Sequence, residues 1–300
     1  MRGNLRAFRR YPWQRKLFTI FNYLILAFAA LICILPIFNI LAISLSSSAA
    51  AGSGAVRFWP VDFTFESYNF VTAKPEFMQS FWVSVKRVLV GVPVNMLLTI
   101  LAAYPLSKTR AQFRARQFYV WFFFITMLFS GGLIPYYMTI SKVGLIDNFW
   151  ALILPGAVPV YNVIILLNFF RQLPTEIEEA ARVDGASYLR ILAQIVVPLS
   201  LPAIATLTLF CTVNHWNSWF EGLLLMNRPE HYPLQSYLQT VIVNRDMSLM
   251  STTDILTLST VSDRTSKAAQ TFVAALPMLV VYPFLQKYFA AGLTMGGVKG

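Results

Sequence analysis

Cysteine and histidine, the residues on which disulfide and metal sites most often depend, are scarce in this sequence of 300 residues. It contains only 2 Cys and 2 His, so a disulfide framework or a multi-histidine metal site is nearly excluded. Cys33 and Cys211 both lie in apolar segments, where a small buried side chain is the expected state. Cys211 and His215 are four residues apart and could share one helix face, but no third ligand lies nearby. We therefore expect no metal site.

The short motifs of ATP-hydrolysing and hydrolytic enzymes are also missing. A P-loop contains Gly-Lys followed by Ser or Thr, because a lysine and backbone amides must hold the phosphates, and Gly-Lys occurs nowhere in the chain. The patterns Gly-x-Ser-x-Gly, His-Glu-x-x-His and Cys-x-x-Cys are absent as well. We expect a chain that is not an enzyme, with no catalytic residue and no cofactor of its own.

Charged residues make up only 12% of the chain, against about 25% in a typical soluble domain. Hydrophobic residues make up 57%, and they gather in six runs at 18–45, 81–106, 118–140, 149–170, 198–222 and 268–290. A bilayer core needs about 20 apolar residues in helical form, and unpaired backbone groups are not tolerated in lipid. The sequence therefore predicts an all-α integral membrane protein, a single domain over residues 1–300 with six transmembrane helices.

The basic residues are distributed unevenly between alternate loops. Four segments hold 15 of the 24 Lys and Arg: the N-terminus (1–17), the 105–117 loop, the 171–197 loop and the C-terminal end, with Lys287 and the tail 291–300. The positive-inside rule places these segments in the cytoplasm. Lys86 and Arg87, within the second run, would join the outer set if their side chains reach outward. The net charge of +11 is thus explained by topology rather than by nucleic-acid binding.

Two segments are expected outside, 46–80 and 223–267, and the second is expected to form short surface helices. The basic N-terminus resembles the start of a signal peptide. However, the first run is much longer than the apolar stretch of a signal peptide, which has about 7–15 residues. We expect an uncleaved first span, and both termini in the cytoplasm.

One polar segment, RQLPTEIEEAARVDGASYLRILAQIVVP at 171–198, interrupts the apolar second half. Thr175 and Glu178 have the spacing of a capping box, Pro174 stops the preceding span, and Gly185 is a candidate left-handed terminator. The pattern predicts a helix at 176–185, too short to cross a membrane. A solvated loop helix is one interpretation of it.

The spacing within this segment points to another interpretation. Glu179-Ala180-Ala181 is followed by three residues, Gly185, nine residues, and then Ile195, one residue, Val197 and Pro198. This resembles the signature E-A-A-x3-G-x9-I-x-L-P of the membrane subunits of ATP-binding-cassette (ABC) importers, with Val in place of Leu. AYPLSK (103–108), GLIDNFWALILP (144–155) and GLTMGGVKG (292–300) also resemble the carbohydrate permeases of that family, in the maltose-type and oligosaccharide branch.

The resemblance implies a type I ABC importer permease in the bacterial inner membrane, importing oligosaccharides or polysaccharide fragments. It implies that the short helix is a coupling helix, which docks in a cleft of a cytoplasmic ATPase through Glu178, Glu179, Ala180, Ala181, Asp184 and Gly185. It further implies two ABC ATPase subunits that bind ATP and Mg, a second and distinct permease, and an extracytoplasmic solute-binding protein received by the outer loops. The C-terminal tail would extend towards the ATPase pair.

Polar and aromatic residues near the outer half of the fifth run suggest a substrate path. Aromatic rings can stack on sugar faces, and amides can pair with hydroxyls. The candidates are Asn95, Asn214, His215, Trp216, Asn217 and Trp219. An interfacial aromatic belt with polar helix contacts is the alternative. Pro93 and the stretch from Gly131 to Pro135 are candidate breaks in the second and third runs, either kinks or parts of a cavity lining.

An ion-gradient-driven secondary transporter and a channel are the functional alternatives. Ion-coupled carriers usually place acidic or histidine side chains deep within their spans. The six runs are almost free of Asp and Glu: Asp147 and Glu221 lie at span edges, and His215 is the one titratable candidate far into a run. Neither alternative explains the Glu-Ala-Ala spacing.

Overall fold

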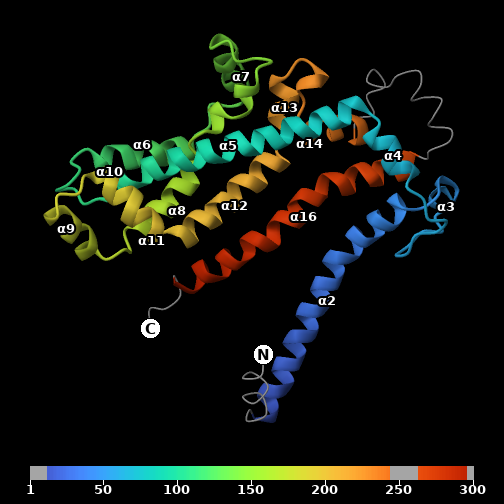
Figure 1. Ribbon diagram of the computed structural model, residues 1–300, viewed down its shortest axis with the longest axis horizontal. Helices are drawn as coiled ribbons and strands as arrows, with labels where there is room; N and C mark the ends of the chain where they lie inside the picture. The colour runs from blue at the N-terminus through green and yellow to red at the C-terminus, as the bar shows by residue number, and fades with distance from the viewer. Residues whose placement is uncertain (1–11, 244–262, 296–300) are drawn as a thin grey trace. The chain divides into compact units, whose positions relative to one another are not determined.

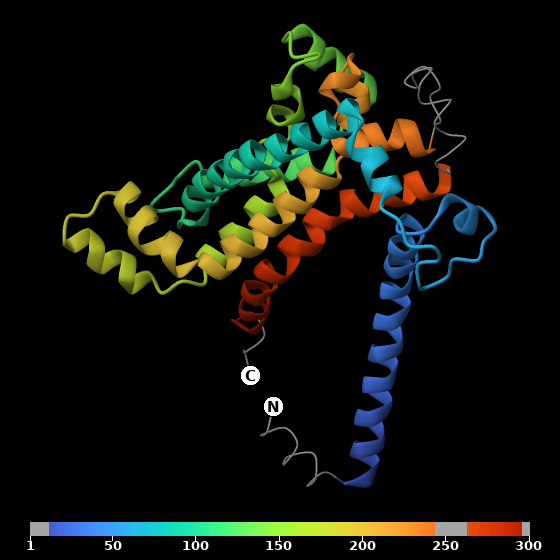
Figure 2. The same cartoon turned by 45° about the vertical axis from the view of Figure 1, so that its right-hand side comes forward.

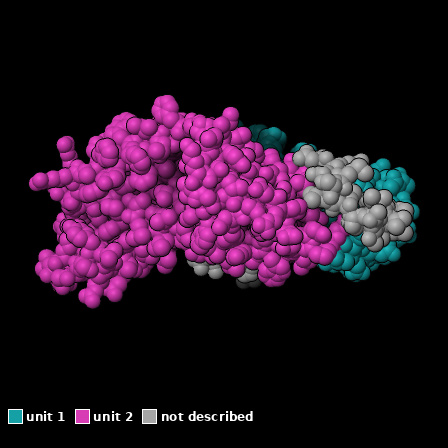
Figure 3. Space-filling model, turned by 90° about the horizontal axis from the view of Figure 1, so that it is seen from above, with its two compact units in different colours: residues 1–73, 248–273 teal, residues 74–247, 274–300 magenta. Residues whose placement is uncertain are grey.

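The computed structural model describes residues 12–243 and 263–295, and all regular structure in these residues is helical (Figure 1). The chain divides into two compact units (Figure 3). Unit 1 comprises residues 1–73 and 248–273, and unit 2 comprises residues 74–247 and 274–300. The predictions for residues 1–11, for most of the Ser/Thr-rich outer segment and for the last five residues of the tail concern parts of the chain outside the described residues.

Unit 1 is built around the first predicted span. Helix α2 (Trp13–Ser44) is long and apolar enough to cross a membrane, and only its last three residues are buried. A small core of Ala42, Ile43, Ala51 and neighbouring residues joins the end of α2 to α3 (Ser48–Gly52) and to the start of α16 (Asp263–Met295). The helix α4 (Glu66–Thr72) completes the described elements of this unit. Most of the apolar surface of α2 is thus left for lipid or for a partner within the membrane.

Helix α5 (Pro75–Ser107) is the central element of unit 2. It packs against α8 (Val160–Phe170) and α12 (Leu201–Asn217) through a core that includes Met96, Leu166 and Leu207. The helix begins at Pro75, in the first turn where a missing amide costs little. Residues 75–80 are therefore helical as well, so the helix begins before the predicted apolar run at 81–106. The helix also continues through Pro93, where a break was considered.

The third, fourth and fifth predicted runs are bent rather than straight. In the third, α6 (Arg116–Leu128) and α7 (Leu133–Lys142) meet at 116°, next to Gly132 with its φ of +85°. The fourth consists of η1 (Phe149–Leu152), η2 (Leu154–Gly156) and α8, with a bend of 46°. The fifth begins with three short helices in succession: α10 (Tyr188–Ile191), the π-helix η3 (Leu192–Val196) and α11 (Val197–Leu199). This segment meets α12 at an angle of 83°.

If each bent pair is counted as one span, the described part of the chain contains up to five membrane spans. Helix α16 coincides with the sixth predicted run. The all-α membrane fold is thus confirmed, although the fifth run is already helical at Tyr188, ten residues before the predicted start.

Within residues 218–243, four short helices follow α12: α13 (Phe220–Leu225), η4 (Pro229–His231), α14 (Leu234–Leu238) and the π-helix η5 (Gln239–Val243). Short helices were predicted here. Their expected surface position was wrong for α14, because Leu234 and Tyr237 are buried and α14 packs on α5.

Candidate functional site

The predicted coupling helix is α9 (Thr175–Val183), which lies at the extreme end of unit 2 (Figure 1, Figure 2). Gly185 ends it with a φ of +77°, and the amides of Gly185 and Ala186 bond to the carbonyls of Arg182 and Ala181. This is a Schellman motif, which confirms the predicted terminator. The predicted capping box was wrong: Thr175 is the first helical residue, and no side chain caps the helix.

The Glu178 side chain is held inside the protein instead of at the helix start. Its carboxylate pairs with Lys108, whose Nζ lies 2.6 Å from Oε1, and with Arg182, which lies 3.6 Å from Oε2. The Lys108 and Glu178 side chains are only 10% and 15% exposed, and Lys108 also lies over the ring of Tyr104. Burial lowers the pKa of Lys108 against the opposing effect of Glu178. Glu178 therefore anchors α9 to the end of α5.

The other predicted docking residues mostly face outward. Ala181 is half-buried, whereas Glu179, Ala180, Asp184 and Gly185 are exposed. Apolar side chains accompany them, since Val183 is 89% exposed. We call the exposed set the α9 surface: Glu176, Ile177, Glu179, Ala180, Val183, Asp184 and Gly185. It combines acidic, small and apolar groups on a short projecting helix.

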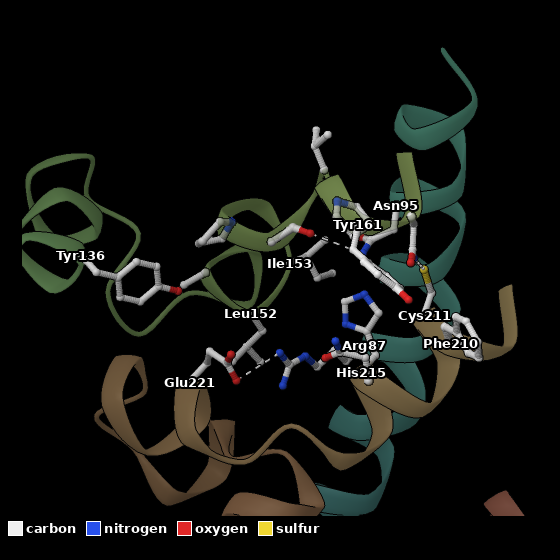
Figure 4. Close-up of a pocket in the computed structure, with 17 residues that line it drawn as sticks. Arg87, Asn95, Tyr136, Leu152, Ile153, Tyr161, Phe210, Cys211, His215 and Glu221 are labelled. Carbon is white, nitrogen blue, oxygen red and sulfur yellow. Dashed lines mark hydrogen bonds and ion pairs between the residues drawn. The ribbon is translucent and has the colours of Figure 1, made fainter. Parts of the chain in front are cut away.

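A cavity of about 640 Å³ lies among α5, α8, α12 and the η1–η2 segment (Figure 4). Asn95, Asn214 and His215 line it, so the structure brings three of the six predicted path residues together. Asn217 and Trp219 line a separate hollow of about 590 Å³, into which Asn214 also reaches. Trp216 is buried and lines neither hollow, and its indole N–H donates to the carbonyl of Ala274 at 2.9 Å.

Arg87 and Glu221 also line the cavity, and both escaped the sequence-based prediction. Arg87 is 4% exposed, so its side chain is buried and does not reach outward. One guanidinium nitrogen donates to the carbonyl of Ser218 at 3.3 Å, and another lies 3.7 Å from Glu221. Its Nε has no hydrogen-bond partner among the described residues. An arginine within an apolar run was the signal available, because charges inside spans usually mark functional sites.

Other polar atoms around the cavity are also without partners in the described part of the chain. These include Asn95 Oδ1 and His215 Nε2, both buried. Gly91 allows the ring of His215 to lie against α5, since a Cβ there would come within 2.7 Å of it. Cys211 accepts a hydrogen bond from Asn162 at 3.2 Å. The cavity wall thus carries unused hydrogen-bonding groups suited to a polar ligand.

A polar tie joins two loops near α7 and α13. Asp147, with a φ of +58°, accepts from Arg228 at 2.9 Å, from His231 at 2.8 Å and from the amide of Asn227 at 3.1 Å. Burial raises the pKa of Asp147, but these hydrogen bonds outweigh it and hold the pKa below its usual value. The tie fixes the chain before η1, which lines the cavity, to the segment around η4.

Comparison with known proteins identifies the family. Residues 3–295 match the family described as the binding-protein-dependent transport system inner membrane component. The chain belongs to this family. It is 39% identical over 285 residues to protein LplC of Bacillus subtilis (strain 168), covering 95% of this chain and 96% of LplC. It is 38% identical over 292 residues to the polygalacturonan/rhamnogalacturonan transport system permease protein YtcP of the same organism, covering 96% of this chain and 100% of YtcP.

A solved structure agrees with this assignment. A chain of a bacterial ABC transporter involved in the import of the acidic polysaccharide alginate matches with a TM-score of 0.84 and 33% identity, covering 93% of this chain and 99% of that one. The predictions of an ABC importer permease and of a non-catalytic subunit are therefore confirmed.

Proposed function

We propose that this permease imports acidic oligosaccharides across the bacterial inner membrane, with both termini in the cytoplasm. The observation that carries the proposal is the cavity with Arg87 in its wall. A volume of about 640 Å³ falls in the range of ligand pockets, about 300–1,000 Å³. The relatives named for polygalacturonan and alginate, both acidic, support the same substrate class.

The chemistry of the cavity suits a sugar that carries a carboxylate. A guanidinium binds carboxylates through two parallel N–H donors, and Nε of Arg87 has no other partner among the described residues. Glu221 lies 3.7 Å from Arg87 and is more exposed, so a substrate carboxylate can replace it as the partner. Asn95 and His215 offer groups for hydroxyls, and Tyr161 and Phe210 offer ring faces.

The energy for transport would come from ATP hydrolysis by ATPase subunits that bind the α9 surface. Isolated exposed ion pairs contribute only about 0–1 kcal/mol, so the apolar side chains of Ile177 and Val183 would provide most of the docking free energy. Closure of two ATPases, which hold ATP and Mg, would displace α9. The pair of Glu178 with Lys108 would pass this displacement to α5, which lines the cavity with Arg87 and Asn95.

The remaining partners follow from the same proposal. A second permease would face this one across the substrate path and cover part of the apolar surface left exposed in each unit. A solute-binding protein would deliver the oligosaccharide to the outer loops 46–80 and 223–267. The family description, which names binding-protein-dependent transport, supports this partner.

The test is uptake by the complete importer in lipid vesicles. Labelled oligouronates and neutral oligosaccharides of equal length should be compared, with ATP inside or outside. We expect ATP-dependent import of the oligouronate, and a loss of about 10- to 100-fold in Arg87→Gln, the value of one charged hydrogen-bonded contact. Lys86→Gln is the matched control, because Lys86 is the exposed neighbour on the same helix.

Two outcomes would contradict the proposal. Import that is driven by an ion gradient in the absence of ATP would contradict the ATP-driven mechanism. Equal import of neutral and acidic sugars, unaffected by Arg87→Gln, would remove the acidic substrate while leaving the importer intact.

A further inference from the structure

A second polar hollow, of about 620 Å³, lies beside α9 and is rich in cations. Lys108, Arg116, Arg171 and Arg182 line it, against the two carboxylates of Glu178 and Glu179. It lies between the end of α5, the start of α6, the end of α8 and α9. We call it the basic hollow.

The internal contacts leave this positive charge incompletely neutralised. Lys108 and Arg182 share the single carboxylate of Glu178, and Nε of Arg182 is buried without a partner among the described residues. Arg116 and Arg171 both donate to the carbonyl of Leu106, at 2.9 and 3.3 Å. This carbonyl belongs to the last turn of α5 and carries no net charge. No ion pair joins Arg116 or Arg171 to a carboxylate in the described residues. The basic hollow therefore favours an anion.

An apolar hollow of about 300 Å³ adjoins it. Lys108 and Gln112 line both hollows, and the rest of the second wall includes Leu101, Phe113 and Leu192. We call this one the apolar hollow. Helix α6, which begins at Arg116, has no buried residue, and its Phe118, Trp121 and Phe122 are exposed. An aromatic face of this kind is suited to a lipid environment.

We propose that the two hollows together bind one anionic phospholipid, with its phosphate in the basic hollow and the upper part of an acyl chain in the apolar hollow. A free phosphate would use only the first hollow. A basic pocket between helices at the cytoplasmic surface of a membrane protein is a suitable site for an anionic headgroup. The proposal relies on the cytoplasmic position of α9 given above, but not on the identity of the sugar.

The lipid would act on the anchor between α9 and α5. Its phosphate would lie among the same side chains that hold Glu178, and it would bridge Arg116 of α6 and Arg171, the residue that follows α8. These contacts fix the end of α5 against its neighbours. ATPase activity that depends on the binding protein should therefore rise when anionic lipid is present.

The test uses the complete importer in nanodiscs of phosphatidylcholine alone or mixed with phosphatidylglycerol. Lipid retained after detergent washing is counted by native mass spectrometry, and binding-protein-stimulated ATPase is measured in parallel. We expect retained phosphatidylglycerol and higher stimulated ATPase in the mixed discs. Arg171→Gln should weaken retention by about fivefold, and Arg116→Gln should do the same. Arg190→Gln, an exposed arginine outside both hollows, is the matched control and should change neither quantity.

A further variant distinguishes a lipid from a free anion. Leu101→Gln alters only the apolar hollow and leaves the basic hollow, including Arg171, unchanged. It should nevertheless weaken the retention of phosphatidylglycerol. The proposal would be overturned if inorganic phosphate displaced the lipid equally well from Leu101→Gln and from the unaltered protein. Unchanged retention in Arg171→Gln, with thermal unfolding equal to that of the unaltered protein, would overturn it too. Arg171 is exposed, so this variant serves even if Arg116→Gln fails to fold.

Discussion

Replacement of Glu178 by glutamine tests whether α9 is anchored to α5 as the structure indicates. The change keeps the size of the side chain and removes its charge. Lys108 and Arg182 would then lose their shared carboxylate, and Lys108, which is 10% exposed, would be left as a poorly compensated cation. Glu179, one residue away and exposed, provides the matched control in Glu179→Gln.

The expected magnitude follows from the burial of the pair. An exposed ion pair contributes about 0–1 kcal/mol, and removing one partner of a buried pair costs about 3–5 kcal/mol. Lys108 and Glu178 are mostly buried but border a hollow of about 620 Å³ that water can enter. An intermediate cost of about 2 kcal/mol is therefore expected, which corresponds to an increase of about 30-fold in the detached state of α9.

Hydrogen exchange on the complete importer in nanodiscs measures this population directly. Amides of residues 176–183 should exchange about 30-fold faster in Glu178→Gln, and by less than about twofold in Glu179→Gln. Transport per ATP hydrolysed should fall in Glu178→Gln, because docking would remain while displacement of α9 would reach α5 less efficiently. In Glu179→Gln, affinity for the ATPase would change instead.

Equal exchange in the two variants would refute the anchoring argument. So would a drop in transport without any change in exchange over α9, since that result would place the effect of Glu178 at the ATPase interface.

Three other changes test single features of the structure. Gly185→Ala should destabilise the end of α9 by about 1–2 kcal/mol at a φ of +77°, and Gly185→Asn, which tolerates this conformation better, should recover part of the loss in coupled ATPase assays. Gly91→Ala should overpack the contact with His215 at a cost of about 1–3 kcal/mol and so lower the thermal unfolding temperature. Adding His215→Ala to Gly91→Ala should restore that temperature. If the double variant unfolds at the same lowered temperature as Gly91→Ala, the contact is contradicted. Because the pKa of Asp147 is lowered, the stability that its carboxylate contributes is present above its ordinary pKa and is lost as the pH falls below about 4. Proteolysis of residues 226–232 should therefore increase below about pH 4. In Asp147→Asn, the rate of this proteolysis should no longer depend on pH in that range.

The sequence predicted the positions of the apolar membrane segments better than their shape. Hydropathy detects apolar composition, which a bent span has as well as a straight one. Gly132 marked the break between α6 and α7, but a glycine indicates only that a positive φ is possible and not the angle of 116° that results. At Pro93 the opposite occurred. The packing of α8 and α12 against α5 keeps the helix continuous through that proline.

The coupling helix was predictable because its ends are encoded locally, by Pro174 and Gly185. The orientation of its side chains was not. Glu178 looked like a docking residue, but Lys108 lies 70 positions earlier, and nothing local predicts that the two meet. The cavity shows the same limit: Asn95 and His215 come together through the packing of α5 on α12, and Gly91 makes room for that contact only in three dimensions.

Two of the connections that leave the α9 region differ in stiffness, and this difference determines which of the two can transmit a displacement. On one side the chain passes through η3, a π-helix, and then turns by 83° near Ser200 before it reaches α12, so a push along this route is absorbed by bending. On the other side Glu178 contacts Lys108, and α5 runs unbroken from there past Asn95, about 20 Å away at about 1.5 Å per residue. Pro93 lies just beyond Asn95 and, like Pro105 near the end of α5, cannot donate a helical hydrogen bond, so the helix is weakened there. Displacement of α9 should therefore carry Asn95 with it and change the angle of the segment that bears Arg87, so that the cavity wall moves on one side of Pro93 more than on the other.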